Sequence, residues 1–481
     1  MLVAKRIKGK AIAALLGPMG QKARHALARA RGDGPLAYYF DVEDPWSYLG
    51  AQVLARLVAH YQVPFELHVI SRPAQDVVPA GGLRDAYAVR DAHELASYYD
   101  LDFPGKKTAD PGMALRMACG LVRELSAEER LAAILEMGKG LWTGDNKPIA
   151  TVLGRIGAES TVAVPPILAT SYSALRKRGH YLGAMFWHRG TWYGALDRLG
   201  HLEAALAKET GKAVAGVLRV RPEGERGPLR LATDKNRPTL AVEAWFSFRS
   251  PYSYLALEQL AAAIEPSGLP LVLRPIAPMV ERGQVLVSAK RNYILEDAKR
   301  EADRLGLPFG EVCDPLGKGV EACLAISHHL AARDDGHRSL LAFARSALRG
   351  AWSQARDLSE YVDLRAVVEQ ADLSFADAAR WVAESQQAGA AMAAANAADL
   401  EAMGLWGVPS FRVGDLWLWG QDRLELLTDR LRRHALAVAA QPAAEAPTPR
   451  RQRRQRPELS GRPKLAEPRR EPVPGGYRSS P

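Results

Sequence analysis

The sequence has few cysteines and no long apolar segment. Only three of its 481 residues are cysteines, and none forms a C-x-x-C pair. A disulfide framework is therefore excluded, and we expect a reducing, cytoplasmic location. No uncharged apolar run approaches the roughly 18–20 residues of a membrane span, so we expect no transmembrane segment. The histidines, including His328 and His329, lack the spacing of metal ligands, and we expect no metal site.

The central part of the chain lacks an excess of basic residues, although the net charge is +10. Residues 1–34 carry a charge of +7 and residues 449–481 carry another +7, which leaves −4 for residues 35–448. A specific nucleic-acid-binding core is therefore not indicated. With 47% hydrophobic residues, the chain can bury large cores.

The ends and one internal segment differ from the rest in composition. Residues 1–34 are basic and rich in alanine, which is typical of a solvated N-terminal arm; a transit-like or membrane-surface helix is the alternative. Residues 437–481 are dominated by Pro, Arg, Gln and Glu without an apolar period, and we predict a disordered basic tail. Residues 211–238 are polar and interrupted by Gly and Pro, and we interpret them as a linker.

The sequence before the linker repeats in the sequence after it. Tyr87 follows Pro45 by 42 positions, and Tyr293 follows Pro251 by 42 positions. In both cases an aspartate follows the tyrosine by four positions, and each half ends with Asp-Arg-Leu before an amphipathic helix. These shared offsets predict two tandem homologous domains. The first half is 35–210 and the second half is 239–436.

The sequence predicts the same order of helices and strands in both halves. A strand and a helix are followed by a second strand, a long helical stretch, two short strands and a last helix, which is an α/β layout. The helical stretches, about 84–180 and 288–405, are too long for ordinary crossovers, and we interpret them as inserted helical subdomains. The predicted strands are Leu36–Val42, Phe65–Ile70, Leu240–Phe248, Leu271–Arg274, Gly407–Val413 and Leu416–Trp419.

Two stretches of the second half carry the candidate chemistry. In the first, a buried strand breaks at Ser250 and Pro251 and leads into a helix, which places a hydroxyl beside the unpaired N–H groups of a helix N-terminus. Such a place stabilises a thiolate, although a plain N-cap is the alternative reading of Ser250. In the second, Pro409 follows Gly407-Val408 at the start of a strand, which indicates either a cis peptide bond or an ordinary edge-strand proline.

Together these stretches resemble the 2-hydroxychromene-2-carboxylate isomerases and their relatives, the kappa-class glutathione transferases. That family has a DsbA-like thioredoxin fold with a helical insertion, so the resemblance implies two tandem domains of this kind. It covers about 240–436 well and 36–210 more loosely. The matching residues are Phe248–Ala256, Arg274-Pro275, Lys290, Tyr293, Asp297, Gly407–Phe411 and Trp419–Leu424.

The resemblance implies a glutathione site. Ser250 matches the serine that faces the glutathione sulfur. Val408, before Pro409, matches the residue whose backbone pairs with the tripeptide. Asp422, with Gln421 beside it, matches the carboxylate that takes the γ-glutamyl ammonium, although Asp-Arg-Leu is equally typical of plain helix capping. Contacts with the substrate are assigned to Tyr252, Lys290 and Trp419.

The sequence departs from the family pattern in both halves. Glu281–Gln284 stands where the family has Asn-x-Gly-Pro, which leaves the contacts with the glycyl end of glutathione open. In the first half Asp44 replaces the serine, and Ala184 replaces the proline. A carboxylate would repel a thiolate, so the first half is interpreted as degenerate, with Asp44 as an N-cap. Cys119 and Cys323 are interpreted as buried structural thiols.

Three functions follow, in order of preference. The first is a glutathione-dependent isomerase or transferase, in which the bound thiolate adds to an unsaturated aromatic carbonyl substrate and leaves after bond rotation. The second is a non-catalytic protein of two thioredoxin-like domains. The third is a DsbA-like oxidoreductase, which the serines at Ser250 and Ser253 oppose. The expected partner is a small molecule, and the halves are expected to pair as the subunits of a family dimer do.

Overall fold

The computed structural model describes most of the two halves. The described residues are 9, 12–17, 19, 20, 22, 23, 26, 34–78, 81–226, 231, 240–333 and 335–439. The predicted disordered tail lies outside them from residue 440 onward, as do most of the predicted N-terminal arm and part of the predicted linker. Among the described helices, none is long and apolar enough to cross a membrane.

The first half is built on a four-stranded mixed sheet with the strand order β2-β1-β3-β4. Strand β1 pairs in parallel with β2 and antiparallel with β3, and β3 pairs antiparallel with β4. All six residues of β1 are buried, as a central strand covered on both faces requires. The strands are β1 (Leu36–Asp41), β2 (Phe65–Ile70), β3 (Met185–His188) and β4 (Thr191–Gly194).

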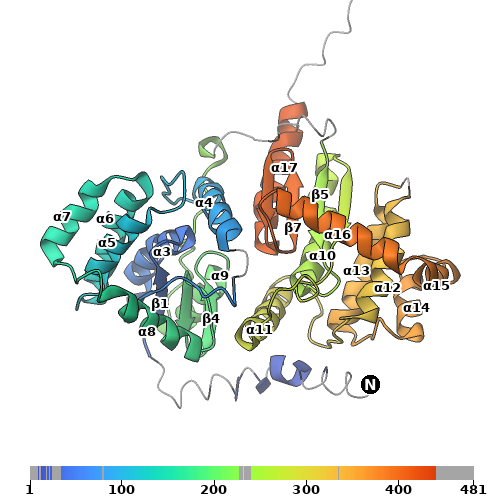
Figure 1. The fold of residues 1–481 in the computed structure, drawn as a ribbon, viewed down its shortest axis with the longest axis horizontal. Coiled ribbons are helices and arrows are strands. Elements are labelled where there is room, and N and C mark those ends of the chain that lie inside the picture. Colours follow the sequence, from blue (N-terminus) through green and yellow to red (C-terminus); the bar gives the residue numbers. More distant parts are fainter. Residues whose placement is uncertain are drawn as a thin grey trace, which may run out of the picture. The chain divides into compact units, whose positions relative to one another are not determined.

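Helices fill the connection between β2 and β3 of the first half. Helix α3 begins at Pro45 because Asp44 caps it and accepts a hydrogen bond from the N–H of Ser47, which confirms the predicted N-cap. Figure 1 shows α5, α6 and α7 gathered together near α3. The helices are α3 (Pro45–Tyr61), α4 (Gly81–Tyr98), α5 (Pro111–Leu121), α6 (Ala127–Thr143), α7 (Asn146–Ile156), α8 (Val164–Lys177) and α9 (Leu199–Thr210).

The second half has a sheet of the same strand order, β6-β5-β7-β8. Its pairings also match, because β5 is parallel to β6 and antiparallel to β7, and β7 is antiparallel to β8. The prediction that both halves share one strand order is therefore confirmed. The strands are β5 (Val242–Phe246), β6 (Leu271–Pro275), β7 (Ser410–Val413) and β8 (Leu416–Trp419).

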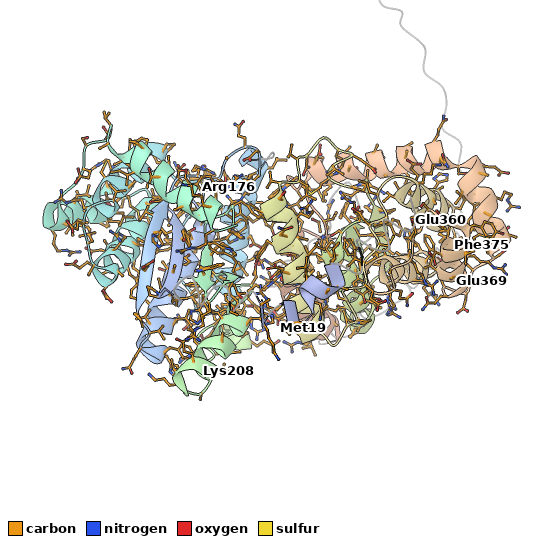
Figure 2. The ribbon with its side chains drawn as sticks, turned by 90° about the horizontal axis from the view of Figure 1, so that it is seen from below. Met19, Arg176, Lys208, Glu360, Glu369 and Phe375 are labelled. Atoms are coloured by element: carbon orange, nitrogen blue, oxygen red, sulfur yellow. The ribbon has the colours of Figure 1, made fainter. Side chains whose placement is uncertain are left out.

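The helical insertion of the second half lies between β6 and β7. Figure 2 shows Glu360, Glu369 and Phe375 together at one end of it, around α14 and α15. The helices of this half are α10 (Pro251–Ile264), α11 (Ser288–Arg304), α12 (Lys318–Ala331), α13 (Arg338–Ser353), α14 (Tyr361–Glu369), α15 (Phe375–Glu384), α16 (Gln386–Ala402) and α17 (Leu424–Ala439), the last preceded by the 3₁₀ turn η3 (Gln421–Arg423).

Each half has its own apolar core between its sheet and its helices. Cys119 lies in the first core and Cys323 in the second, so both predicted buried thiols are buried. Burial raises the pKa of both thiols, which keeps them protonated near neutral pH.

Several predicted segments differ from the structure. The predicted strand Leu240–Phe248 is shorter, as β5, and residues 437–439 of the predicted disordered tail belong to α17. Strand β7 starts at Ser410 instead of Gly407, because the preceding Val408–Pro409 bond is cis and Pro409 has no N–H for the ladder. The described part of the predicted linker, up to residue 226, packs against the first half. The Arg221 guanidinium, for example, donates to backbone carbonyls of the first half. In the predicted solvated arm, residues 12–16 are helical and Leu16 is buried.

Candidate functional site

A cavity of about 1080 Å³ brings together all eight site residues predicted from the sequence. They are Ser250, Tyr252, Lys290, Val408, Pro409, Trp419, Gln421 and Asp422. The first half also lines this cavity, through Trp46, Arg84, the loop 180–185 and the segment 194–198. The candidate site is therefore built by both halves, although the resemblance places it in the second half alone.

Ser250 lies at the N-terminus of α10. Its hydroxyl oxygen accepts a hydrogen bond from the N–H of Ser253 at 3.1 Å, so the residue is an N-cap, as predicted. Among the described residues, the hydroxyl donates to no acceptor. The N–H groups of Ser253 and Tyr254 already donate to Ser250, and Pro251 has no N–H. The Ser250 O–H group and the N–H of Tyr252, which has no hydrogen-bond partner among the described residues, are therefore available to an anion in the cavity.

The Val408–Pro409 peptide bond is cis, as predicted, and lines the same cavity as Ser250. Neither the amide nor the carbonyl of Val408 forms a hydrogen bond within the described part of the chain. A Cβ atom at Gly407 would lie 2.4 Å from Nε1 of Trp419, so only glycine leaves room for this indole. The segment thus presents a free peptide group, which an extended ligand backbone can pair with.

Asp422 and Gln421 lie on the 3₁₀ turn that precedes α17. The Asp422 carboxylate accepts from the guanidinium of Arg198 in the first half, and it also accepts from the amide group of Gln421 at 2.6 Å. Burial, opposed by Arg198 and reinforced by Asp197, raises the pKa of Asp422 to about 7. The predicted ammonium-binding carboxylate is therefore partly compensated before any ligand binds.

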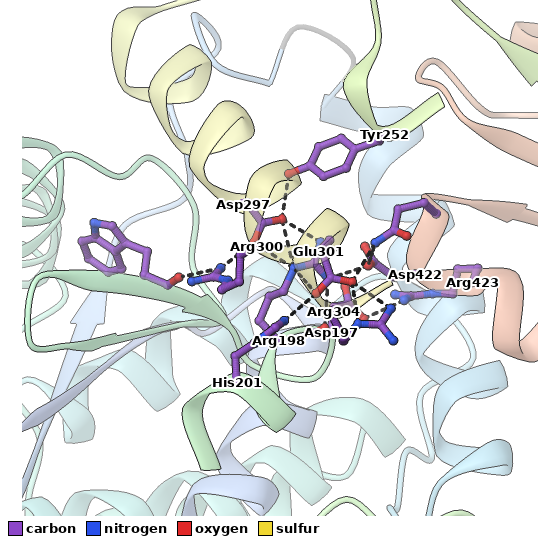
Figure 3. Close-up of polar contacts among 12 residues, drawn as sticks. Asp197, Arg198, His201, Tyr252, Asp297, Arg300, Glu301, Arg304, Asp422 and Arg423 are labelled. Atoms are coloured by element: carbon purple, nitrogen blue, oxygen red, sulfur yellow. Dashed lines mark hydrogen bonds and ion pairs between the residues drawn. The ribbon is translucent and has the colours of Figure 1, made fainter. Parts of the chain in front are cut away.

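Tyr252 is fixed by a buried carboxylate of α11. Its hydroxyl donates to Asp297 at 2.8 Å, and Arg198 of the first half donates to both oxygens of the same carboxylate (Figure 3). Burial alone would raise the pKa of Asp297, but Arg198 and Arg300 lower it, so the carboxylate stays ionised. Tyr252 therefore has one orientation toward the cavity.

Lys290 and Trp419 lie in the cavity wall with different partners. The Lys290 ammonium lies 3.4 Å from the carbonyl oxygen of Val77 in the first half, and burial lowers its pKa. The Trp419 ring centroid lies 4.7 Å from that of Trp406, and Tyr87 of the first half packs edge-on against both indoles. These two indoles give the cavity an aromatic wall suited to a flat ligand.

Arg282 is a site residue that the sequence did not single out as one. Its Nη2 donates to the carbonyl of Trp406 at 3.0 Å, whereas its Nε and Nη1 have no hydrogen-bond partner among the described residues. Its nearest carboxylate belongs to the exposed Glu401, 3.7 Å from Nη1. The side chain is only 13% exposed and lines the cavity, so it presents unused donors to a ligand.

The equivalent place in the first half is already filled by protein groups. The Asp44 carboxylate accepts from the N–H and hydroxyl of Ser47 and from the buried Arg84, at 2.8–3.2 Å. Ala184, which replaces the proline, has a φ of 53°. Burial and Asp44 raise the pKa of the neighbouring Asp41 to about 7. This region therefore contains buried carboxyl groups, of which Asp44 is already bonded to protein groups, in place of a thiolate-stabilising hydroxyl.

Comparison with known proteins identifies the fold of the second half. Residues 241–432 match the family described as "DSBA-like thioredoxin domain", so this region has a DsbA-like thioredoxin fold. No curated protein sequence matches the chain.

Solved structures similar to the chain include two enzymes. One is 2-hydroxychromene-2-carboxylate isomerase, at 21% identity and a TM-score of 0.35, over 41% of this chain and 98% of that one. Another is the cytosolic disulfide reductase DsbM of Pseudomonas aeruginosa, at 21% identity and a TM-score of 0.33, over 42% of this chain and 99% of that one. The structure of the same reductase with GSH has 18% identity and a TM-score of 0.30, over 42% of this chain and 100% of that one.

Proposed function

We propose that the chain is a glutathione-dependent isomerase or transferase that resembles 2-hydroxychromene-2-carboxylate isomerase and acts on an unsaturated, aromatic carbonyl compound. The observation that carries the proposal is that one cavity contains both the Ser250 hydroxyl at a helix N-terminus and the unpaired Val408 backbone. At about 1080 Å³ the cavity is at the upper end of the range for small-molecule sites, so it has room for a tripeptide and a second ligand.

The charges around the cis peptide bond match a zwitterionic tripeptide. Arg282 is hydrogen-bonded to Trp406, on the N-terminal side of the bond. Asp422 lies on the other side, two residues after Gly420, whose N–H donates to the carbonyl of Pro409 at 2.9 Å. A ligand backbone paired with Val408 would place its ammonium at Asp422 and its glycyl carboxylate at Arg282. Arg282 would then supply the contact that the family's missing Asn-x-Gly-Pro segment leaves open.

Glutathione in this cavity would supply a thiolate nucleophile. The protein itself offers none there, because all three cysteines are buried and none lines the cavity. The Ser250 hydroxyl and the N–H of Tyr252 at the start of α10 would hold the negative charge on the sulfur. Tyr252, Lys290 and Trp419 would orient the carbonyl compound against it. The same facts oppose a thiol–disulfide oxidoreductase, since Ser250 and Ser253 stand at the dithiol positions.

We further propose that the halves are a tandem duplication and pair as the two subunits of a kappa-class or isomerase dimer would. Arg198 of the first half contacts Asp297 of the second, and Arg423 of the second contacts Asp91 of the first. Such reciprocal contacts are typical of a two-fold interface between copies. In this arrangement the first half is non-catalytic and completes the wall of a single glutathione site. A cytoplasmic location, where glutathione is abundant and thiols stay reduced, is part of the proposal.

Binding to immobilised glutathione tests the proposal. We expect the full chain to be retained and to be released by free glutathione. Ser250→Ala should reduce thiolate formation, measured by the ultraviolet absorbance of bound glutathione, more than it reduces retention. Ser374→Ala is the matched control, because Ser374 caps α15 in the same way but lies outside the cavity. A chain that passes through unretained would contradict a glutathione site.

A further inference from the structure

His180 has a defined tautomer in the wall of the cavity that the first half provides. It lies between α8 and β3, and its side chain is fully buried. The N–H of Leu182 donates to its Nδ1 at 3.2 Å. Because Nδ1 accepts this hydrogen bond, the neutral imidazole carries its proton on Nε2.

Aromatic rings from both halves fix the position of this imidazole. It stacks on Tyr181, with centroids 4.7 Å apart and an interplanar angle of 16°, and packs against Trp192 at 4.9 Å. Tyr293 from α11 of the second half meets it edge-on at 4.7 Å. Burial lowers the pKa of His180 to about 3, so the ring stays neutral at physiological pH.

The Nε2–H of His180 is a donor without an acceptor. Among the described residues it has no hydrogen-bond partner, although it is buried. Buried N–H groups in proteins are rarely left unpaired, so an acceptor is expected when the cavity is filled. A neutral donor within an aromatic wall suits an uncharged oxygen better than a carboxylate, whose desolvation there would need a counter-charge.

We propose that His180 binds the carbonyl oxygen of an aromatic enone or aldehyde through Nε2–H. The indoles of Trp406 and Trp419 line the same cavity and suit the flat part of such a ligand. The binding itself is independent of glutathione. Only its consequence for turnover rests on the proposed function: as nucleophilic addition shifts negative charge onto the carbonyl oxygen, the His180 donor would stabilise that charge without giving up its proton.

Two substitutions separate the donor from the structural role of the ring. His180→Gln places an amide nitrogen near the position of Nε2 and loses the acceptor for Leu182. His180→Asn keeps an acceptor near the position of Nδ1 and has no donor at Nε2. The probes are benzylideneacetone and its diene analogue, in which a methylene group replaces the carbonyl oxygen. Dissociation constants are measured by calorimetry without glutathione, with His328→Asn, outside the cavity, as the control.

We expect the wild type, His180→Gln and His328→Asn to prefer the ketone over the diene by about three- to tenfold, the range of one hydrogen bond. His180→Asn should bind both probes equally. The proposal is overturned if the wild type binds neither probe or shows no preference, or if His180→Asn keeps the preference while His180→Gln loses it. Failure to retain glutathione alongside an intact ketone preference would refute the proposed function and leave the His180 site standing.

Discussion

Arg198 of the first half donates to both carboxylate oxygens of Asp297 of the second half, at 2.6–2.9 Å, and both side chains are buried (Figure 3). Asp297 in turn accepts the hydroxyl of Tyr252 in the cavity wall. The first half therefore positions a residue of the candidate site. The symmetric pair, Arg423 and Asp91, is equally buried, and the Asp91 carboxylate also accepts the indole N–H of Trp46 at 2.8 Å.

Arg198→Met should strongly destabilise the protein. It leaves the Asp297 carboxylate buried without its main counter-charge, and breaking one side of a buried ion pair typically costs about 3–5 kcal/mol. Urea denaturation measures the free energy of unfolding. In the double variant Arg198→Met/Asp297→Asn part of the loss should return, because the buried charge of Asp297 is removed together with its partner. The rest should not return, because Asp422 still lacks its contact with Arg198.

Arg176→Met is the matched control for this prediction. Arg176 pairs with Asp76 at 3.1 Å, but the two side chains are 30% and 46% exposed. Exposed ion pairs contribute about 0–1 kcal/mol, so the control should unfold almost as the wild type does. Equal effects of the two substitutions would mean that the Arg198 contact adds nothing beyond a surface pair.

The sequence predicts the site residues of the second half because their signals are local. A Ser-Pro pair after a buried strand predicts a capped helix start at Ser250, and the structure has the expected hydrogen bond. The Gly-Val-Pro-Ser-Phe segment predicts a cis bond at Pro409, and that bond is cis. Each conclusion depends on a few neighbouring residues, so the arrangement of the rest of the chain does not alter it.

The contribution of the first half could not be predicted in the same way. Arg198 belongs to an Asp-Arg-Leu pattern that capping explains equally well, and its partner Asp297 lies 99 positions away. The spacing does place both residues at repeated positions, but only the pairing of the halves brings them together. A lone histidine such as His180 carries no signal at all, because its role depends on the rings packed around it.

The affinity for S-methylglutathione, which has no free thiol, should fall as the pH decreases below about 7. The raised pKa of Asp422, about 7, means that its carboxyl group becomes neutral below that pH and no longer attracts an ammonium group. For one group of this pKa, binding at pH 6 should be about tenfold weaker than at pH 8.

Asp422→Asn provides the control for the pH dependence. The groups that face Asp422, namely Arg198, Asp197, Gln421 and Arg423, remain in this variant. Affinity should then be low and nearly independent of pH between 6 and 8. If the affinity of Asp422→Asn depends on pH as strongly as that of the wild type, the titrating group is another one, such as Asp41 in the first half, whose pKa is also raised to about 7.

Ser250→Ala should lower glutathione-dependent turnover of a conjugated enone by roughly ten- to a thousandfold, the usual effect of losing one oriented donor to an anion. The loss of an N-cap costs only about 1 kcal/mol of stability, so the fold should persist. Ser374→Ala removes a cap of the same kind from α15 and should leave turnover unchanged. Initial rates at saturating glutathione test this prediction. Equal rates for the wild type and Ser250→Ala would mean that the glutathione sulfur does not lie at Ser250.

Arg282→Met should weaken glutathione binding by about ten- to a hundredfold, because a hydrogen bond to a charged group contributes about 1.5–3 kcal/mol. The unused donors of Arg282 lie at the end of the cis-proline segment where the glycyl carboxylate is expected. Esterifying that carboxylate should therefore have the same effect on the wild type as the substitution does. In Arg282→Met, glutathione and its glycyl ester should bind equally, as measured by calorimetry. If the variant still prefers glutathione over the ester, another cation such as Lys290 holds the glycyl end, and the tripeptide lies in the cavity in a different direction from the one proposed.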